Sequence, residues 1–400
     1  MHSTTQQVTN KPLGWRLWLA LIVLSFSSFM IVTTELAPIG LLSTLAQDFH
    51  QSEAVMGFIV TGYGWIAAIA ALFSVLIFVR FPRKPVLIIL MFVLALSNFT
   101  VAHSQTFMTI FLARVIGAIA HGGFWALIGS VAYHLVPKEK LGLATSIIFS
   151  GVSVASVLGV PFANWVTQLQ GWQFSFNIMG AAAVLIAFLI AFYVPKIAKD
   201  VIPVKGFLKE VFYHPILKRL FFLTALIISA HFAAFTFIEP FLVNVVYLPM
   251  NQVATLLLIF GLSGLIGNVV AAKWIDQYLF TILMSALVGI GLSLLGLVYI
   301  QHQFIFWQVV SFLMIWGASI AALFVGLQTW VLTIAKVQAT AASAIYVAIF
   351  NASIGFGALI GGILIQLFSL IYAFQLIILL LIVAIIVLMK VMKHAKVENT

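Results

Sequence analysis

The chain has 400 residues, of which 64% are hydrophobic and 7% are charged, with a mean hydropathy of +1.21 and a formal net charge of +10. So few polar residues cannot cover a folded chain with groups that water solvates, which excludes a water-soluble globular protein and indicates a lipid bilayer as the solvent. The basic residues lie between apolar runs, so no nucleic-acid partner is expected, and the lack of cysteine excludes disulfides and thiolate chemistry.

The first half of the sequence contains six apolar runs, each of about 20 residues or more and therefore long enough to cross a membrane as a helix. These runs lie near residues 17–41, 54–78, 85–103, 106–134, 141–167 and 173–194. Polar and apolar residues do not alternate with a period of two, which favours an α-helical bundle over a β-barrel.

The second half contains six more apolar runs after a polar segment with several basic residues. They lie near residues 220–246, 252–272, 279–300, 304–332, 339–366 and 369–390. The pattern predicts an all-α membrane protein with twelve transmembrane helices in two six-helix bundles. The expected domains are an N-terminal bundle at 1–194, a cytoplasmic linker at 195–219 and a C-terminal bundle at 220–400.

Lysine and arginine are concentrated in alternate loops. Of the 19 basic residues, all but Arg114 lie in the two terminal segments or in every second loop, and the intervening loops carry none. Positively charged loops stay on the cytoplasmic side of a membrane. The distribution therefore supports twelve spans and predicts that both termini are cytoplasmic.

Three charged residues lie deep in the predicted spans, where an ionisable side chain costs at least about 2.5 kcal/mol and is kept for pairing or function. Glu35 in the first span and Glu239 in the seventh occupy equivalent helices at comparable depth. Arg114 in the fourth span lies within a turn or two of Glu35, so an ion pair is geometrically possible. We expect these residues to couple protons to transport, and the alternative is that they only fix helix packing.

Two histidines are the other titratable groups deep in the spans. His121 lies in the fourth span and His231 in the seventh. Imidazole can change its charge near neutral pH, so each could couple protons or bind the substrate by a hydrogen bond. A satisfied core histidine is the alternative for both.

Aromatic and amide side chains in the spans are candidates for substrate binding. An amphiphilic pocket needs apolar rings with a few polar groups among them. Helix packing and interhelical hydrogen bonds are the alternative roles of such residues. The candidates are Tyr63, Phe124, Trp125, Phe235, Gln328, Tyr346 and Asn351.

Signatures of enzymes and of ATP-driven motors are missing from the sequence. It contains no GxxxxGK[ST] loop, no HExxH pair and no GxSxG elbow. We therefore expect neither an enzyme nor a metal site or cofactor, and the proton gradient is the expected source of energy.

Five stretches resemble the major facilitator superfamily, and more closely its bacterial drug:proton antiporter branch, which includes the sugar efflux transporters. The resemblance extends over nearly the whole chain. The stretches are TTELAPIGLLSTLAQDF at 33–49, RVIGAIAHGGFWA at 114–126, LGVPFANWV at 158–166, GWQFSF at 171–176 and AHFAAFTFIEPFL at 230–242.

The resemblance assigns roles to residues of two spans. Arg114 and Gly117 match a motif of the fourth span that the family links to proton transfer. Gly151, Gly159 and Pro161 match the antiporter motif of the fifth span, although its last glycine position is Ala163 here.

The loop between the second and third spans departs from the family pattern of Gly-x-x-x-Asp-Arg-x-Gly-Arg-Arg. Arg83 and Lys84 fit its basic end, but Val79 and Pro82 replace the acidic residue and the glycine. This departure weakens the expected cytoplasmic charge-relay gate. A possible equivalent in the second half is Lys273 with Asp276.

The resemblance implies proton-coupled efflux of small molecules by alternating access, with sugars, sugar analogues or amphiphilic drugs as substrates. It implies a multi-pass, monomeric protein of the bacterial inner membrane whose partners are the substrate, protons and lipid. Two alternatives stay open at this stage. One is a proton-coupled importer or facilitator of a small polar solute, and the other is a membrane receptor or scaffold that transports nothing.

Overall fold

The computed structural model describes residues 14–78, 81–137, 140–197, 210–211, 213–300, 306–335 and 339–397. Every secondary-structure element in these described ranges is a helix, because a backbone in lipid must satisfy its polar groups within the same segment. The elements are α1 (Trp15–Leu36), η1 (Ala37–Gly40), α2 (Leu42–Asp48), α3 (Glu53–Met56), α4 (Phe58–Phe78), α5 (Arg83–Ala102), α6 (Phe107–Leu135), α7 (Leu141–Gln170), α8 (Trp172–Tyr193), α10 (Pro215–Phe235), α11 (Ile238–Asn244), α12 (Met250–Ile300), α13 (Phe306–Ala335), α14 (Ala339–Leu367) and α15 (Leu370–Val397).

Twelve segments of the described chain are long and apolar enough to cross a membrane, which confirms the predicted all-α fold with twelve spans. The long helix α12 supplies two of them, Met250–Ile275 and Gln277–Ile300. The two spans meet at Tyr278, where the backbone leaves the helical region with φ −126° and ψ 28°. An even number of spans brings both ends of the chain to the same side of the membrane.

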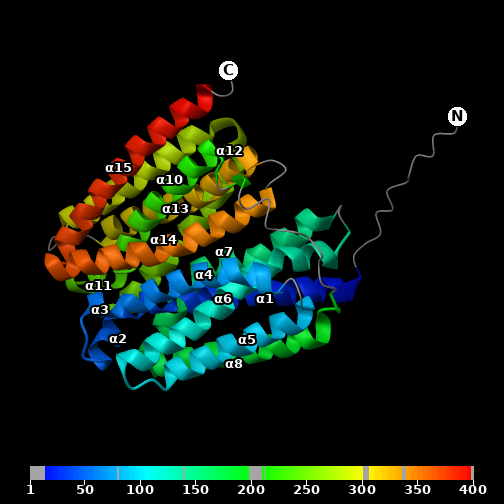
Figure 1. Ribbon diagram of the computed structural model, residues 1–400. Helices are drawn as coiled ribbons and strands as arrows, with labels where there is room; N and C mark the ends of the chain where they lie inside the picture. Colours follow the sequence, from blue (N-terminus) through cyan, green and yellow to red (C-terminus); the bar gives the residue numbers. More distant parts are fainter. Residues whose placement is uncertain are drawn as a thin grey trace.

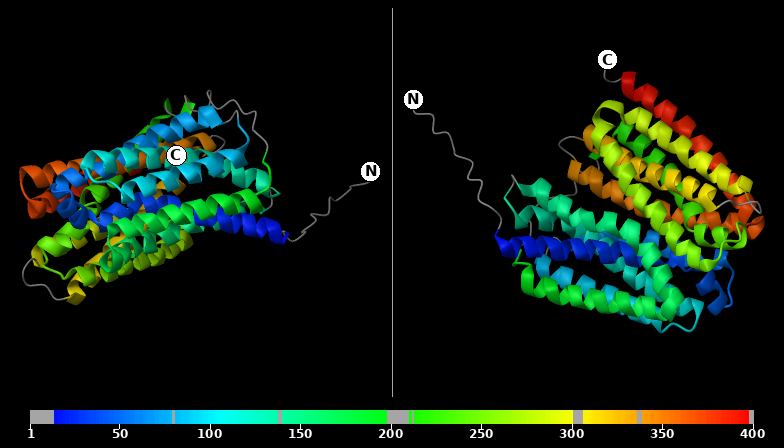
Figure 2. Two further views of the ribbon diagram at one scale, coloured as in Figure 1. Left: turned by 90° about the horizontal axis from the view of Figure 1, so that it is seen from below. Right: turned by 180° about the vertical axis from the view of Figure 1, so that it is seen from behind.

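The helices form two groups that lean against each other (Figure 1). Helices α1 to α8 lie together in one group, and α10 to α15 lie together in the other, as the view from behind also shows (Figure 2). Of the predicted linker, residues 198–209 and 212 lie outside the described residues. The domain boundaries at this linker therefore stay a prediction.

Small residues let helices of the two groups approach closely. Helix α4 packs against α14, and α7 packs against α12. A Cβ atom on Gly64 would lie 2.7 Å from the Asn351 backbone oxygen, and one on Gly261 would lie 2.5 Å from the Val157 Cα. Glycine is therefore required at both crossings, since a larger residue would force the backbones apart.

The predicted packing glycines of the fifth span lie within the first group instead. A Cβ atom on Gly151 would lie 2.0 Å from the Ser25 backbone oxygen, and one on Gly159 would lie 3.1 Å from the Thr33 hydroxyl. Both glycines therefore hold α7 against α1. Pro161 lies inside α7, in the same part of the helix as Gly159.

The first and seventh spans are both interrupted in their second halves. Helix α1 ends at Leu36 and continues as the short 3₁₀ helix η1, which has Pro38 in its first turn. Helix α10 ends at Phe235, and the chain continues after a break as α11, which contains Pro240. Proline cannot donate a backbone hydrogen bond, so these interruptions leave carbonyl groups for other partners. Glu35 and Glu239 lie next to the two interruptions.

Candidate functional site

Arg114 of α6 is held at the end of α1 and is 1% exposed. Its Nη1 donates to the Thr34 carbonyl at 2.5 Å, and its Nη2 donates to the Glu35 carbonyl at 2.9 Å. Its Cζ lies 4.0 Å from the centre of the Tyr63 ring, within the range of a cation–π contact. The carbonyls at the end of a helix carry partial negative charge and lack helical partners, which suits a guanidinium. Its hydrogen bonds in the described structure therefore go to backbone carbonyls, not to the Glu35 carboxylate.

The Glu35 carboxylate faces the His121 imidazole. Its Oε2 lies 3.9 Å from His121 Nδ1, and the two residues are 7% and 2% exposed. Neither Glu35 Oε1 nor His121 Nδ1 has a hydrogen-bond partner among the described residues, and Arg114 Nε also lacks one. Enclosed polar atoms without partners are costly and are usually retained for a ligand, a water or a proton. The three residues thus form a polar site with spare hydrogen-bonding capacity, which we call the acid–histidine site.

Two aromatic rings border the acid–histidine site in the first group of helices. The Tyr63 ring packs edge-on against His121 with centroids 5.5 Å apart, and Trp125 does so at 6.2 Å. The Tyr63 hydroxyl donates to the Gly117 carbonyl at 3.5 Å. A Cβ atom on Gly117 would lie 2.5 Å from the Ser97 hydroxyl, so this glycine makes room for α5.

Asn351 of α14 reaches the acid–histidine site from the other group of helices. The amide lies beside His121, and its Nδ2 donates to the Val347 carbonyl at 2.9 Å. Its Oδ1 has no hydrogen-bond partner in the described part of the chain. The side chain is 5% exposed and lies at the crossing of α4 and α14. The site therefore joins both groups of helices, as an alternating-access site requires.

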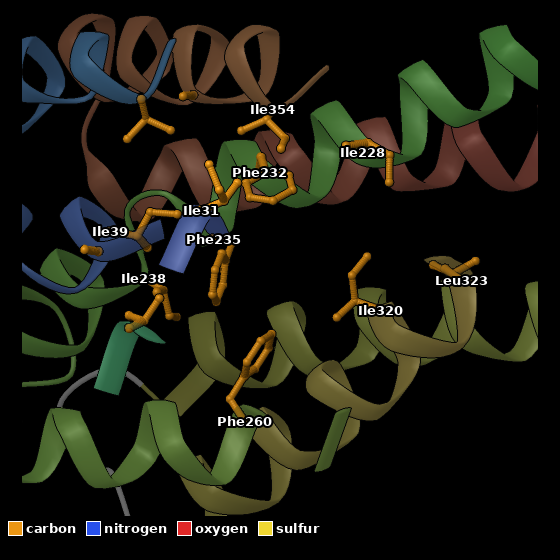
Figure 3. Close-up of a cluster of buried hydrophobic side chains, with 14 of the residues drawn as sticks. Ile31, Ile39, Ile228, Phe232, Phe235, Ile238, Phe260, Ile320, Leu323 and Ile354 are labelled. Atoms are coloured by element: carbon orange, nitrogen blue, oxygen red, sulfur yellow. The ribbon is translucent and has the colours of Figure 1, made fainter. Parts of the chain in front are cut away.

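His231 of α10 lies in a different environment, against aromatic rings. Its Nδ1 accepts a hydrogen bond of 3.1 Å from the Trp316 Nε1–H of α13. The imidazole stacks on Phe235 with centroids 5.1 Å apart and an angle of 18°. Phe235 in turn stacks on Phe260 of α12 at 4.9 Å, and Figure 3 shows these two rings pointing toward each other. We call His231, Phe235, Phe260 and Trp316 the aromatic wall.

Glu239 contacts the first group of helices across the boundary between the groups. The residue is 0% exposed, and its Oε2 accepts a hydrogen bond of 2.9 Å from the Ser43 backbone N–H. Glu53 Oε1 accepts hydrogen bonds from the Ser43 hydroxyl at 3.0 Å and from Asn244 Nδ2 at 2.8 Å. We call Ser43, Glu53, Glu239 and Asn244 the outer latch, because they lie at the end of the molecule that is predicted to be extracellular.

The outer latch borders a groove of about 510 Å³ that Gln47, Gln51 and Met250 also line. Beside it, Gln168 Nε2 donates to the Met250 carbonyl at 2.9 Å, which adds another bond between the groups. These hydrogen bonds hold the two groups of helices together at the end opposite the chain termini.

The other predicted substrate-binding residues lie outside the acid–histidine site and the aromatic wall. Phe124 is 0% exposed and packs edge-on against Trp125. The Tyr346 hydroxyl donates to the Phe324 carbonyl at 3.4 Å, and the Phe324 ring also contacts His231. Gln328 is half-buried on α13.

Two residues of the predicted cytoplasmic gate donate hydrogen bonds to backbone carbonyls of the first half of the chain. Arg83 Nη1 donates to the Phe78 carbonyl at 3.1 Å, and Lys84 Nζ donates to the Ala191 carbonyl at 2.7 Å. Lys273 Nζ lies 4.9 Å from the centre of the Trp274 ring. The Asp276 side chain lies outside the described residues, so the expected pairing of Lys273 with Asp276 stays untested.

Sequence reasoning missed Trp316, Glu53, Ser43 and Asn244. Glu53 and Asn244 lie at the ends of spans, where polar residues are ordinary, and Trp316 is one of 10 tryptophans. No sequence pattern distinguishes these residues. Among the described residues, no group of three or more His, Cys, Asp or Glu side chains could hold a metal ion.

Comparison with known proteins matches residues 17–343 to the family model of the Major Facilitator Superfamily. Solved structures with a similar fold include a bacterial homologue of the human lysosomal transporter Spinster in an inward-facing, unoccupied conformation, with a TM-score of 0.77, 14% identity, and 95% of this chain and 98% of that chain covered. A mutant of the nucleoside transporter NupG has a TM-score of 0.78, 17% identity, and coverage of 94% and 99%. A POT family transporter in complex with 5-aminolevulinic acid has a TM-score of 0.78, 11% identity, and coverage of 94% and 95%.

Proposed function

The chain belongs to the major facilitator superfamily of secondary transporters, which are not enzymes, and we propose that it is a proton-coupled exporter of small molecules. Such proteins work by alternating access, in which two bundles rock about a central site. Sugars, sugar analogues and amphiphilic drugs are the proposed substrates. The proposed branch is that of the drug:proton antiporters, on the motifs around Arg114 and in the fifth span.

The observation that carries the proposal is the Glu35 carboxylate, which is buried beside His121 with an oxygen that has no partner among the described residues. A carboxyl group in this position can take up a proton without breaking a hydrogen bond to the described protein. Arg114 is fixed on the backbone of α1, so its positive charge stays near the carboxylate in either protonation state. Proton transfer at Glu35 therefore changes the net charge of the site by one, which a substrate or a conformational change can compensate.

The order of events follows from this charge change. When the site opens to the outside, protonation of Glu35 neutralises the acid and favours release of the substrate. The site with protonated Glu35 then returns to the inside, where Glu35 releases its proton and the site binds the next substrate. His121 is the neighbouring group that can share the proton with Glu35, and Asn351 brings the second bundle to the same place. The outer latch is closed in the structure, which suits the inward-facing part of this cycle.

Transport by inside-out membrane vesicles tests both direction and coupling. With an acidified interior, vesicles that contain the wild type should accumulate a labelled sugar analogue such as isopropyl thiogalactoside, or ethidium, whereas a facilitator only equilibrates its substrate. Glu35→Gln should abolish this accumulation and keep gradient-independent exchange of the same compound, because a carboxamide binds but carries no proton. The matched control is Glu210→Gln, which changes an exposed acid outside the spans. Full accumulation by Glu35→Gln would refute the coupling role.

A further inference from the structure

The hydrogen bond between Trp316 and His231 fixes the protonation of the imidazole. An indole N–H can only donate a hydrogen bond, so His231 Nδ1 must accept it with a lone pair. The single proton of the neutral ring is then on Nε2. A positively charged imidazole would bring two N–H groups face to face, so protonation of His231 requires the bond to Trp316 to break. This contact therefore favours one neutral tautomer.

The described surroundings of the His231 ring are aromatic and uncharged. The ring contacts are with Phe232 at 4.8 Å, Phe235 at 5.1 Å, Trp316 at 5.7 Å and Phe324 at 5.9 Å between centroids. These residues come from α10 and α13, and Phe260 of α12 and Phe350 of α14 form the next layer. None of these six side chains can ionise, so the charged form of the imidazole would have no compensating partner among them.

The Nε2–H of His231 is a donor without a partner among the described residues. The residue is 3% exposed, and no hydrogen bond joins Nε2 to an acceptor in the described part of the chain. His121 Nδ1 is fully enclosed by the protein, but His231 Nε2 is not, so His231 Nε2 borders accessible space. A nearly buried donor of this kind is available for a ligand.

The aromatic wall lies where the two bundles meet. Phe235 belongs to the same cluster of buried side chains as Ile31 of α1, and the cluster includes Phe260 (Figure 3). Gly261, the next residue after Phe260, contacts Val157 of α7. His121 lies beside the backbone of Ile31, so the acid–histidine site and the aromatic wall both lie near this residue of α1. A solute between the bundles would therefore meet both groups.

We propose that Trp316 holds His231 as a neutral hydrogen-bond donor whose Nε2–H binds an uncharged oxygen of the substrate, while the accessible parts of Phe235 and Phe260, which are 7% and 8% exposed, contact the apolar part of a ring. The substrate class is thus a neutral, oxygen-bearing ring compound such as a glycoside, because a charged group at the wall would lack compensation. Trp316 is a positioning residue and His231 a substrate-binding one. The inference rests on the proposed transport function for its physiological meaning, but its structural part is independent of proton coupling.

Nuclear magnetic resonance of the purified full-length protein with ¹⁵N-labelled histidine tests the tautomer. His231→Gln assigns the signal by its loss. We expect the wild-type ring to stay neutral with the proton on Nε2 between pH 8 and pH 5.5. Trp316→Phe should give a mixture of tautomers and charging on acidification, whereas Trp330→Phe should not change the signal. Trp330 is the matched control because it is buried on the same helix and packs on Phe280. A wild-type ring with its proton on Nδ1, or one that charges in this range, overturns the proposal.

Binding to the same purified variants tests the substrate class, with phenyl β-glucoside as the neutral probe and tetraphenylphosphonium as the cationic one. Complete loss of the donor in His231→Phe should weaken phenyl glucoside binding about three- to tenfold, and Trp316→Phe should weaken it about twofold, because about half of a tautomer mixture lacks the proton on Nε2. Trp330→Phe should bind like the wild type, and Trp316→Phe should lose further affinity on acidification. Equal binding by Trp316→Phe and wild type, or no wild-type binding of the neutral probe, overturns the proposal. If the histidine signal and the probe binding are as expected but transport is not coupled to protons, only the proposed function is refuted. Glu35→Gln should leave the His231 signal unchanged.

Discussion

The two bundles each place a histidine near the bundle boundary, but they surround it with opposite chemistry. His121 faces the Glu35 carboxylate, with Arg114 fixed on the neighbouring backbone. His231 accepts a hydrogen bond from Trp316 and stacks on Phe235. The first site can change charge, whereas the second is built to stay neutral. The difference suits the division of labour that we propose, in which one bundle handles protons and the other recognises an uncharged part of the solute.

The acids of the two bundles differ in the same way. Glu35 and Glu239 lie at equivalent interruptions of the first and seventh spans. Each acid has one oxygen without a partner among the described residues, but the other oxygen of Glu239 accepts from the Ser43 N–H of the opposite bundle, whereas that of Glu35 faces His121 of its own bundle. We therefore expect Glu35 to transfer protons and Glu239 to hold the bundles together. Substitutions at the fixed charge, the histidines and the latch test this comparison, in order of decreasing expected effect.

Arg114→Gln should have the largest effect, because it removes the fixed charge that makes the first site different from the second. The Thr34 and Glu35 carbonyls would lose their donors inside the membrane, which costs about 1–3 kcal/mol and slows a step that needs this geometry by about 10- to 100-fold. Gradient-driven uptake into inside-out vesicles measures the rate, and thermal melting measures stability. Arg114→Lys should recover only part of either, because lysine cannot bind two carbonyls with a planar fork.

The control for Arg114 is Arg16→Gln, which removes an exposed arginine near the start of α1. It should transport and melt like the wild type. A fully active Arg114→Gln would show that a fixed charge is not needed, and the contrast between the two histidine sites would lose its basis.

The histidines themselves should give the second largest effect, with opposite readouts. His121→Gln should change the pH dependence of transport and leave substrate affinity within about twofold, since it removes the neighbour of Glu35 that can carry a proton. His231→Phe should lower affinity about tenfold and keep the pH profile, since it removes one neutral hydrogen-bond donor. The apparent KM and rate across pH 5.5 to 8 separate the two outcomes. Exchanged or identical phenotypes would contradict the division of labour.

The sequence predicts the fold well because hydropathy and the alternation of basic loops depend only on local composition. It also places Arg114 within a turn or two of Glu35, because residues along a helix rise by about 1.5 Å each. The rise along a helix gives the depth of a residue, but it does not give the direction in which its side chain points around the helix axis. Whether Arg114 binds the carboxylate or the carbonyls depends on the interruption at Pro38, which frees the end of α1. In place of the ion pair that helix geometry allows, the structure therefore has a guanidinium bound to the backbone.

The aromatic wall and the outer latch could not be predicted, for a different physical reason. Both depend on contacts between residues far apart in the chain, such as Trp316 with His231 and Glu239 with Ser43. In a chain with 14% aromatic residues, hydropathy does not distinguish a tryptophan that binds a histidine from one that faces lipid. For the same reason, hydropathy does not distinguish a substrate-binding ring from a packed one. Phe124 is a predicted substrate contact, but its side chain is fully enclosed in the structure.

The outer latch should give the smallest effect, because Asn244→Ala removes one of several hydrogen bonds between the bundles. Asn244 Nδ2 donates to Glu53 at 2.8 Å near the surface, and losing such a bond is worth about 1 kcal/mol, or about a fivefold shift toward the outward-open state. Because the chain has no cysteine, spin labels on Gln51→Cys and Asn251→Cys report the distance across this end without background labelling. The population at long distance should rise in Asn244→Ala.

Glu239→Gln sharpens the same test, because it keeps the shape of the side chain and an oxygen that can accept from Ser43 but removes the negative charge. If Glu239 holds the bundles together, this variant should also raise the long-distance population while substrate-dependent proton uptake by the reconstituted protein persists, since Glu35 is intact. Gln105→Ala is the matched control, because Gln105 is an exposed residue in a loop at the same end of the first bundle. Loss of proton uptake in Glu239→Gln with an unchanged distance distribution would place this acid with Glu35 rather than in the latch.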